Sequence, residues 1–414
     1  MLLLIPLKTS DPLDLTTCLS KWVDTSHPRY SSPQIITEIK RLHSLRADIT
    51  KTICTDTSHA YAFDVKNNNR TLQDLIEYHA CLVACTEKGF PVCGRDAKVN
   101  GTIDANLQFS WKNAFDDHEE NTLSEETKSH FNYEIVCVLW NIAALLTYKA
   151  STLHEWDTKE NLSLVKKEYE TSALIFSRIK DILKKAGTKS NGITSDLTDA
   201  SLDMCQYLCL AQGQVCLYEV LKQKLTTSAS SATYTLIAQI SMGTAEIYDR
   251  ALTASQSTDI KFNESSKMYG AHCKSLSMLF KARAEYLQSM VERQSVQYGV
   301  EVARLRRCLE MVNDGIDFTK SNGKQSSKIV FGPASLGKSS LAVLKSLKET
   351  VKQRLNLVSK ENDTIYHEKV PSDDNLPKVV GKDMITSNVN KSSGDPVDLP
   401  VEYLPQSLAR PMFV

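Results

Sequence analysis

Residues 108–147 decide the fold: the stretch begins QFSWKNAF (108–115) and ends FNYEIVCVLWNIAALLT (131–147). In the first part, large apolar residues are interleaved with polar ones, which predicts a short strand or an extended lead-in to a turn. In the second part, apolar residues recur at helical spacing and also fill most of the remaining positions. A helix that is apolar on nearly every side is a buried one. The stretch therefore predicts the central helix of a large helical core.

Asn141 is the polar exception inside this apolar helix. A buried amide usually forms hydrogen bonds with a neighbouring backbone or side chain. We therefore expect Asn141 to fix packing rather than to perform chemistry. Trp111 and Trp140 are predicted to belong to the same scaffold.

Helical patterns run through most of the chain. The segments are about 20–30 residues long and are joined by short loops, which resembles the stacked helical hairpins of solenoid proteins. No strict repeat of the tetratricopeptide length can be read. We expect helices at 35–53, 72–88, 131–150, 161–185, 198–226, 234–254, 265–298, 300–312 and 341–360.

The overall charge gives no argument for a nucleic-acid partner. The 414 residues contain 49 Lys+Arg and 49 Asp+Glu, so the formal net charge is zero. Any charged partner must then be met by a local patch of the surface. No apolar run approaches the roughly 20 residues that a membrane span requires.

The cysteines are predicted to be buried thiols in a reducing, cytoplasmic protein. There are 11 of them, and none forms the C-x2-C pair that a zinc site prefers. Cys205, Cys209 and Cys216 fall on roughly one helix face, where free cysteine behaves as a small apolar residue. We expect no metal and no cofactor.

Residues 332–339 read GPASLGKS and match the phosphate loop G-x-x-x-x-G-K-[ST] letter for letter. Such a loop holds phosphates with backbone N–H groups and a lysine, here Lys338. The fold around it needs a parallel sheet of apolar strands, and the sequence offers almost none. We interpret the segment as a Ser/Gly loop, and keep a P-loop-type nucleotide-binding enzyme as an alternative function.

Residues 304–360 form a basic strip on an otherwise neutral chain. The strip holds twelve basic residues and four acidic ones. Contact with an anionic membrane surface is therefore a second alternative. A solvated helix face followed by a loop explains the same pattern.

Six segments, taken together and in this order, resemble the Bro1 domain family. QFSWKNAF resembles its aromatic strand, and FNYEIVCVLWNIAALLT resembles its signature helix. ENDTIYHEKVP is very similar to the element that closes the domain. The six segments lie at 108–115, 131–147, 209–214 (CLAQGQ), 282–289 (ARAEYLQS), 298–305 (YGVEVARL) and 361–371, and the stretch from Tyr169 to Phe176 also matches the helix that follows the signature helix.

The resemblance implies a mainly α, banana-shaped helical solenoid with a tetratricopeptide-like core and a small N-terminal β-sheet. The domain would span 1–395, with a flexible loop at 316–340 and an extended C-terminal arm at 367–395, followed by a tail at 396–414. The implied function is that of a non-enzymatic adaptor in multivesicular-body sorting and membrane scission. Such an adaptor is cytoplasmic, is recruited to endosomes, and binds the C-terminal amphipathic helix of an ESCRT-III filament subunit.

The resemblance also implies a partner-binding site at Leu217, Leu236 and Ile240. Leu217 stands where the family has a groove aromatic, and Leu236 and Ile240 form an i, i+4 pair on the next helix. Lys159 stands where a member of the family has an acidic residue near the groove. An ordinary core position is the alternative for all three site residues.

Overall fold

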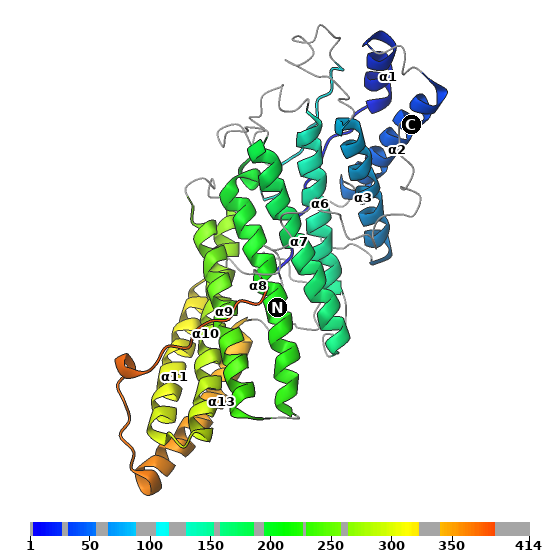
Figure 1. The fold of residues 1–414 in the computed structure, drawn as a ribbon. Coiled ribbons are helices and arrows are strands. Elements are labelled where there is room, and N and C mark those ends of the chain that lie inside the picture. The colour runs from blue at the N-terminus through cyan, green and yellow to red at the C-terminus, as the bar shows by residue number, and fades with distance from the viewer. Residues whose placement is uncertain are drawn as a thin grey trace.

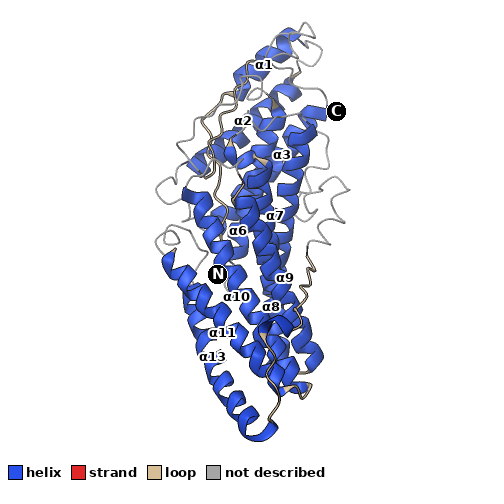
Figure 2. Cartoon of the chain, turned by 90° about the vertical axis from the view of Figure 1, so that its left-hand side faces the viewer, coloured by secondary structure: helices blue, strands red, loops and turns tan. Residues whose placement is uncertain are grey.

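The protein is an elongated stack of helices, each packed against the next along the chain (Figure 1). The structure is a computed structural model, and it describes residues 3–26, 32–54, 65–87, 105–115, 130–152, 158–185, 194–226, 229–257, 264–322 and 340–385. A view turned by 90° shows the same elongated body built almost wholly of helix (Figure 2). The predicted mainly α architecture is confirmed.

The helices form two groups in Figure 1. The first three helices gather at one end, and the remaining ones run antiparallel through the centre to the other end. The helices are α1 (Leu15–Ser26), α2 (Pro33–Cys54), α3 (Val65–Glu87), α6 (Phe131–Thr152), α7 (Lys159–Lys185), α8 (Asp199–Gln223), α9 (Ser231–Ser255), α10 (Glu264–Gln294), α11 (Tyr298–Ser321) and α13 (Ser340–Glu361).

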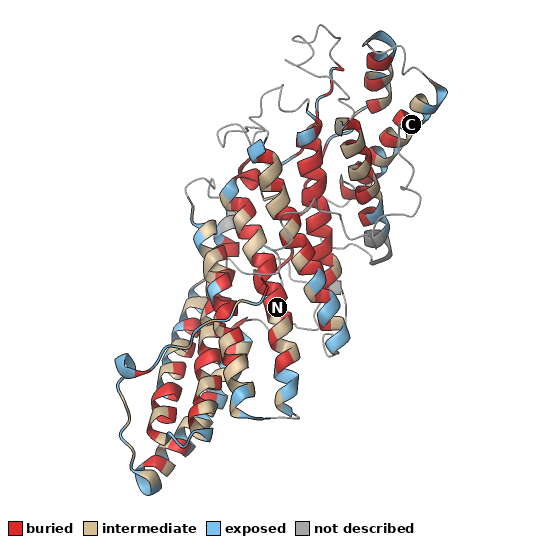
Figure 3. Ribbon diagram, viewed as in Figure 1, coloured by how far each residue is buried: buried red, intermediate tan, exposed pale blue. Residues whose placement is uncertain are grey.

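Helix α6 is the buried central helix that the opening stretch predicts. Residues 131–151 are long and apolar enough to cross a membrane by composition, yet 94% of that window is buried inside the protein. It is red along most of its length in Figure 3. Trp140 packs edge-on against Phe176 of α7, with ring centroids 5.2 Å apart. The hydropathy of α6 is therefore that of a core helix.

The N-terminal segment, residues 3–11, threads between the helices as an extended chain. The side-chain amide of Asn141 both accepts from the Lys8 N–H (2.7 Å) and donates to the Lys8 carbonyl (3.0 Å). Gln212 of α8 holds the N–H and the carbonyl of Leu3 in the same way. The packing role predicted for Asn141 is confirmed.

The small N-terminal β-sheet is not seen among the described residues. They contain one isolated antiparallel bridge, between Ser10 and Trp111. The reason is that amides on helices supply the hydrogen bonds that neighbouring strands would otherwise give to this segment. The sheet expectation was wrong for this part of the chain.

A buried charge network joins the N-terminal end to the core. The Glu134 carboxylate of α6 accepts from Arg46 (3.0 Å), from the Tyr78 hydroxyl (2.9 Å) and from the Trp111 indole. Arg46 also donates to the Ser10 hydroxyl at 2.8 Å. A fully buried carboxylate is tolerated because each of its oxygens has a donor.

The first residues of the segment expected to be a flexible loop, 316–340, are helical, and residues 323–339 lie outside the described part of the chain. Helix α11 continues to Ser321, and Ile316 is buried because this turn still packs against α13. Helix α13 begins at Ser340, close to the predicted start. The phosphate-loop match at 332–339 lies outside the described residues, as does the predicted tail at 396–414.

Candidate functional site

Helices α8 and α9 are antiparallel neighbours, and their register brings Leu217 and Leu236 to one level, with Ile240 one helical turn away. The Gln214 side chain of α8 lies 3.5 Å from the Ile240 carbonyl of α9. Three residues further along α8 is Leu217, and four residues back along α9 is Leu236. Since both steps are about one helical turn, these side chains lie on the faces that carry Gln214 and Ile240.

Leu217 and Leu236 are half-buried, so part of each side chain is available to a partner. Val220 and Gln239, one turn away on the same faces, are half-buried as well. We name these four residues the docking face.

Ile240, in contrast, is 0% exposed. It belongs to the hydrophobic core and does not line an open surface in this structure. The partner-binding role of the three predicted residues stays a prediction, and the burial of Ile240 argues for its core alternative.

The C-terminal arm, here residues 367–385, crosses the α8–α9 pair beside the docking face (Figure 1, orange to red). The Lys382 N–H donates to the Gln239 carbonyl at 2.9 Å. Gly243 lies under the arm: a Cβ on it would be 2.4 Å from the Lys382 carbonyl oxygen. Only glycine lets the two backbones approach so closely.

The charged residues around the docking face are mixed in sign. Lys166 pairs with Glu170 on α7 (2.8 Å), and Lys222 pairs with Glu219 on α8 (3.2 Å). Lys159, the predicted departure from the family, is exposed at the first position of α7. Ion pairs of opposite charge therefore lie on both α7 and α8.

Burial keeps two ionisable groups of the described core, Cys209 and His272, in their neutral forms. Burial raises the pKa of the Cys209 thiol to about 12 and lowers the pKa of His272 to about 3. At neutral pH the first is therefore a neutral thiol and the second a neutral imidazole, so neither is poised as nucleophile or base. Among the described residues, no three His, Cys, Asp or Glu side chains gather as a metal site.

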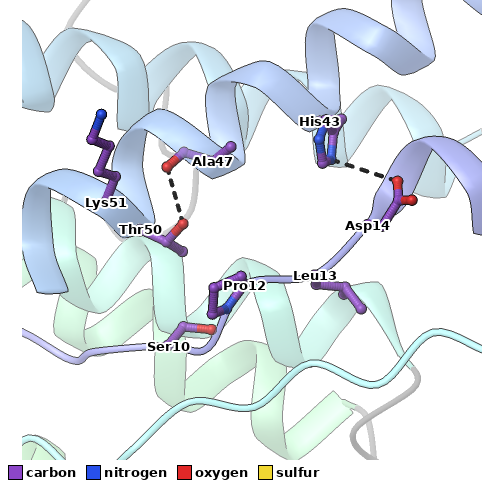
Figure 4. A pocket seen from close by; sticks show the side chains of 8 residues that line it. All are labelled: Ser10, Pro12, Leu13, Asp14, His43, Ala47, Thr50 and Lys51. Atoms are coloured by element: carbon purple, nitrogen blue, oxygen red, sulfur yellow. Dashed lines mark hydrogen bonds and ion pairs between the residues drawn. The ribbon is translucent and has the colours of Figure 1, made fainter.

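A pocket of about 440 Å³ lies at the other end of the molecule, between α2 and the segment that leads into α1 (Figure 4). At its rim, His43 Nδ1 lies 4.0 Å from a carboxylate oxygen of Asp14. Most of its lining is apolar, and no pattern in the sequence pointed to it. It is lined by Ser10, Pro12, Leu13, Asp14, His43, Ala47, Thr50 and Lys51.

The basic strip is less basic at the surface than its sequence indicates. Arg304 is buried in ion pairs with Glu285 (2.9 Å) and Glu292 (3.2 Å). Arg354 of α13 forms an ion pair with Glu301 at 2.6 Å. These arginines hold helices together and are not free to meet a membrane.

Sequence reasoning missed the residues that hold the arm. Gln214 was noted only as part of CLAQGQ, yet its amide bonds the arm at two backbone groups. Asn362, in the closing ENDTIYHEKVP element, holds Glu368 in the same way. Amides in otherwise apolar helices were the available signal, because a buried amide must find partners.

The chain is similar to curated proteins along most of its length. The Programmed cell death 6-interacting protein of Xenopus laevis is 25% identical over 402 residues, covering 96% of this chain and 39% of that protein. The Vacuolar-sorting protein BRO1 of Arabidopsis thaliana is 24% identical over 388 residues, covering 93% of this chain and 40% of that protein. This chain thus spans about two fifths of the length of these relatives.

Solved structures share the fold. One, described as an ALIX BRO1 CHMP4C complex, aligns with a TM-score of 0.70 at 22% identity, covering 97% of this chain and 96% of that one. Another, on endosomal targeting by the Bro1 domain, aligns with a TM-score of 0.66 at 17% identity, covering 99% of this chain and 97% of that one. The family described as BRO1-like domain matches residues 2–410. The chain therefore belongs to the BRO1-like domain family.

Proposed function

We propose that this chain is a non-enzymatic adaptor that binds the C-terminal amphipathic helix of an ESCRT-III filament subunit. The observation that carries the proposal is the family match over residues 2–410, together with the shared fold of an ALIX BRO1 domain in complex with CHMP4C. The names of the relatives, an interacting protein and a vacuolar-sorting protein, support a role in binding and sorting. We further propose that it acts in endosomal sorting and membrane scission as a cytoplasmic protein recruited to endosomes.

The docking face suits the recognition of an amphipathic helix. Such a helix presents apolar residues at i, i+3 and i+4 spacing and places them against apolar side chains in a shallow surface. Leu217 and Leu236 are half-buried and lie at one level on adjacent helices. A bound helix would insert an anchor between them, and the mixed charges at the rim would set its orientation.

Binding of a labelled peptide tests the proposal. Fluorescence anisotropy should detect saturable binding of the C-terminal helix of CHMP4C, and of some members of a panel of ESCRT-III C-terminal helices. A scrambled peptide of the same composition is the control, because it keeps the charge and loses the apolar stripe. Equal binding of the scrambled and native peptides would contradict the proposal.

A peripheral contact with anionic membrane is a second candidate. It is supported by Lys345, Lys352 and Lys360, which are exposed along α13. Sedimentation with phosphatidylserine vesicles should show binding that weakens as salt rises from 50 to about 300 mM, because exposed charges are screened. Charge reversal of these three lysines should abolish vesicle binding. Binding that does not change with salt concentration would contradict the proposed membrane contact.

Nucleotide binding by 332–339 has no support in the part of the chain that the structure describes. The described residues form no parallel sheet of the kind on which a phosphate loop is built. Calorimetry with magnesium and ATP, with Lys338→Ala as the comparison, should show no binding heat.

A further inference from the structure

The arm leaves the body of the protein through a fixed turn. Asn362 donates to the Glu368 carbonyl (2.9 Å) and accepts from the Glu368 N–H (3.2 Å). Between them His367 adopts a left-handed backbone conformation, with φ of 51°. The chain then passes over α11, where a Cβ on Gly299 would lie 2.5 Å from the Lys369 carbonyl oxygen. The direction of the arm is therefore set before it reaches α9 and α8.

At its far end the arm is hydrogen-bonded at two backbone groups by the side chain of Gln214. The Gln214 amide donates to the Lys382 carbonyl (2.8 Å) and accepts from the Met384 N–H (3.1 Å). A neighbouring β-strand would offer the same pair of bonds to residues i and i+2 of an extended chain. One glutamine on a helix thus replaces a strand partner.

Other contacts fix the same stretch of the arm. Asp383 forms an ion pair with Arg250 at 3.2 Å. Ile385 is fully buried, with its Cδ1 3.2 Å from the position of a Cβ on Gly213. Met384 between them remains 40% exposed. The arm is therefore anchored at alternate positions and keeps one apolar side chain at the surface.

We infer that residues 376–385 form a strap that closes one side of the docking face, and that Gln214 is the positioning residue that holds the strap in place. The inference rests on the proposed function. The strap lies across the pair at Gly213 and Gly243, about one turn from Leu217, and the Lys382 N–H donates to the carbonyl of Gln239 in the docking face. It sets where a bound helix ends. A strap that is already ordered spares the partner the entropy of ordering it.

Loosening the strap should weaken partner binding. Gln214→Leu removes both amide bonds while it keeps the approximate volume of the side chain. The affinity for the CHMP4C helix should fall about tenfold, and amide hydrogen exchange at Lys382 and Met384 should accelerate. Asp383→Ala loosens the strap from its own side, where it does not disturb the helices, and should weaken binding about threefold. Circular dichroism checks that both variants keep their helices.

A covalent tie separates positioning from a general loss of structure. A Cβ on Gly381 would lie 2.5 Å from Cδ of Glu246. The Cβ atoms of residues 246 and 381 are therefore at most about 5 Å apart, which overlaps the range that a disulfide requires. In a chain carrying Gln214→Leu, Glu246→Cys and Gly381→Cys, oxidation should restore affinity to within about twofold of the wild type, and reduction should remove the rescue.

Each outcome decides a separate point. Rescue by oxidation, with faster exchange in Gln214→Leu, supports the strap. Unchanged affinity in Gln214→Leu despite faster exchange would overturn its role in binding, and unchanged exchange would overturn the role of Gln214 as its anchor. A wild-type chain that fails to bind the helix peptide would instead remove the proposed function, while hydrogen exchange would still decide whether Gln214 holds the arm.

Discussion

Gly243→Ala should destabilise the protein although it replaces glycine in a helix. The new Cβ would lie 2.4 Å from the Lys382 carbonyl oxygen and 2.9 Å from Nε2 of Gln214. Neither neighbour is free to give way, because the first is backbone and the second is bonded to that backbone. The arm must therefore lift from α9.

The expected loss of stability follows from the hydrogen bonds that break when the arm separates from α9. They are the Lys382 N–H to the Gln239 carbonyl (2.9 Å) and the two bonds of the Gln214 amide (2.8 and 3.1 Å). At about 1 kcal/mol each, their loss costs about 3 kcal/mol. Alanine in place of glycine in a helix returns about 1 kcal/mol. The net expectation is a loss of about 2 kcal/mol.

Gly315→Ala is the matched control. It also lies within a helix, but the closest atom to its Cβ would be a terminal methyl carbon of Leu344, at 3.2 Å, and Met278 Cβ would lie at an ordinary contact distance of 3.6 Å. Its stability should be unchanged or higher by up to about 1 kcal/mol. Urea denaturation gives the stability of both variants, and hydrogen exchange reports whether residues 376–385 lose protection. If Gly243→Ala is as stable as the control and keeps arm protection, the arm does not rest on Gly243.

Three further predictions concern the core. Glu134→Leu leaves Arg46 buried without its counter-ion and should lower the free energy of unfolding by about 3–5 kcal/mol, as measured by urea denaturation. An unchanged denaturation midpoint would show that the buried charge network does not stabilise the protein. Under native conditions the half-buried Cys18 should be alkylated well before Cys209, because burial raises the pKa of the Cys209 thiol to about 12. Peptide mapping after treatment with iodoacetamide gives the order of alkylation. Equal alkylation rates would contradict the burial of Cys209. His272, whose pKa burial lowers to about 3, stays neutral when folded but takes up a proton when unfolded below about pH 6.5, so stability should fall as pH drops from about 6 to 4. His272→Leu should reduce that slope by up to about 1.4 kcal/mol per pH unit, and an identical slope would show that the imidazole is not buried.

The helical scaffold could be predicted because its signals are local. The period of apolar residues in 131–147 marks α6 as a core helix, and Asn141 stands out as a polar residue in the middle of its apolar run 135–146. Helical boundaries at α13 were predicted to within a residue. Packing of helices on their sequence neighbours then follows from short connections.

The site could be predicted only in part, because its details depend on contacts between distant segments. Gln214 and Lys382 are 168 positions apart, so no pattern in either segment reveals that one holds the other. Ile240 is buried in the core of the folded protein, and its helical spacing with Leu236 alone could not distinguish an exposed anchor from a core residue. The β-sheet expectation failed for a related reason, since helix amides hold the N-terminal segment.

The affinity of Leu236→Asp for the CHMP4C C-terminal helix tests the central claim most directly. Aspartate at the fully buried Ile240 would unfold the core, whereas Leu236 is half-buried and tolerates the change. Leu357→Asp is the control, because that leucine is 51% exposed on α13, which packs against α11. We expect the wild type and Leu357→Asp to bind equally, and Leu236→Asp to bind at least about 30-fold more weakly, as for the loss of a central anchor. Equal binding by all three proteins would show that the helix does not dock on this face.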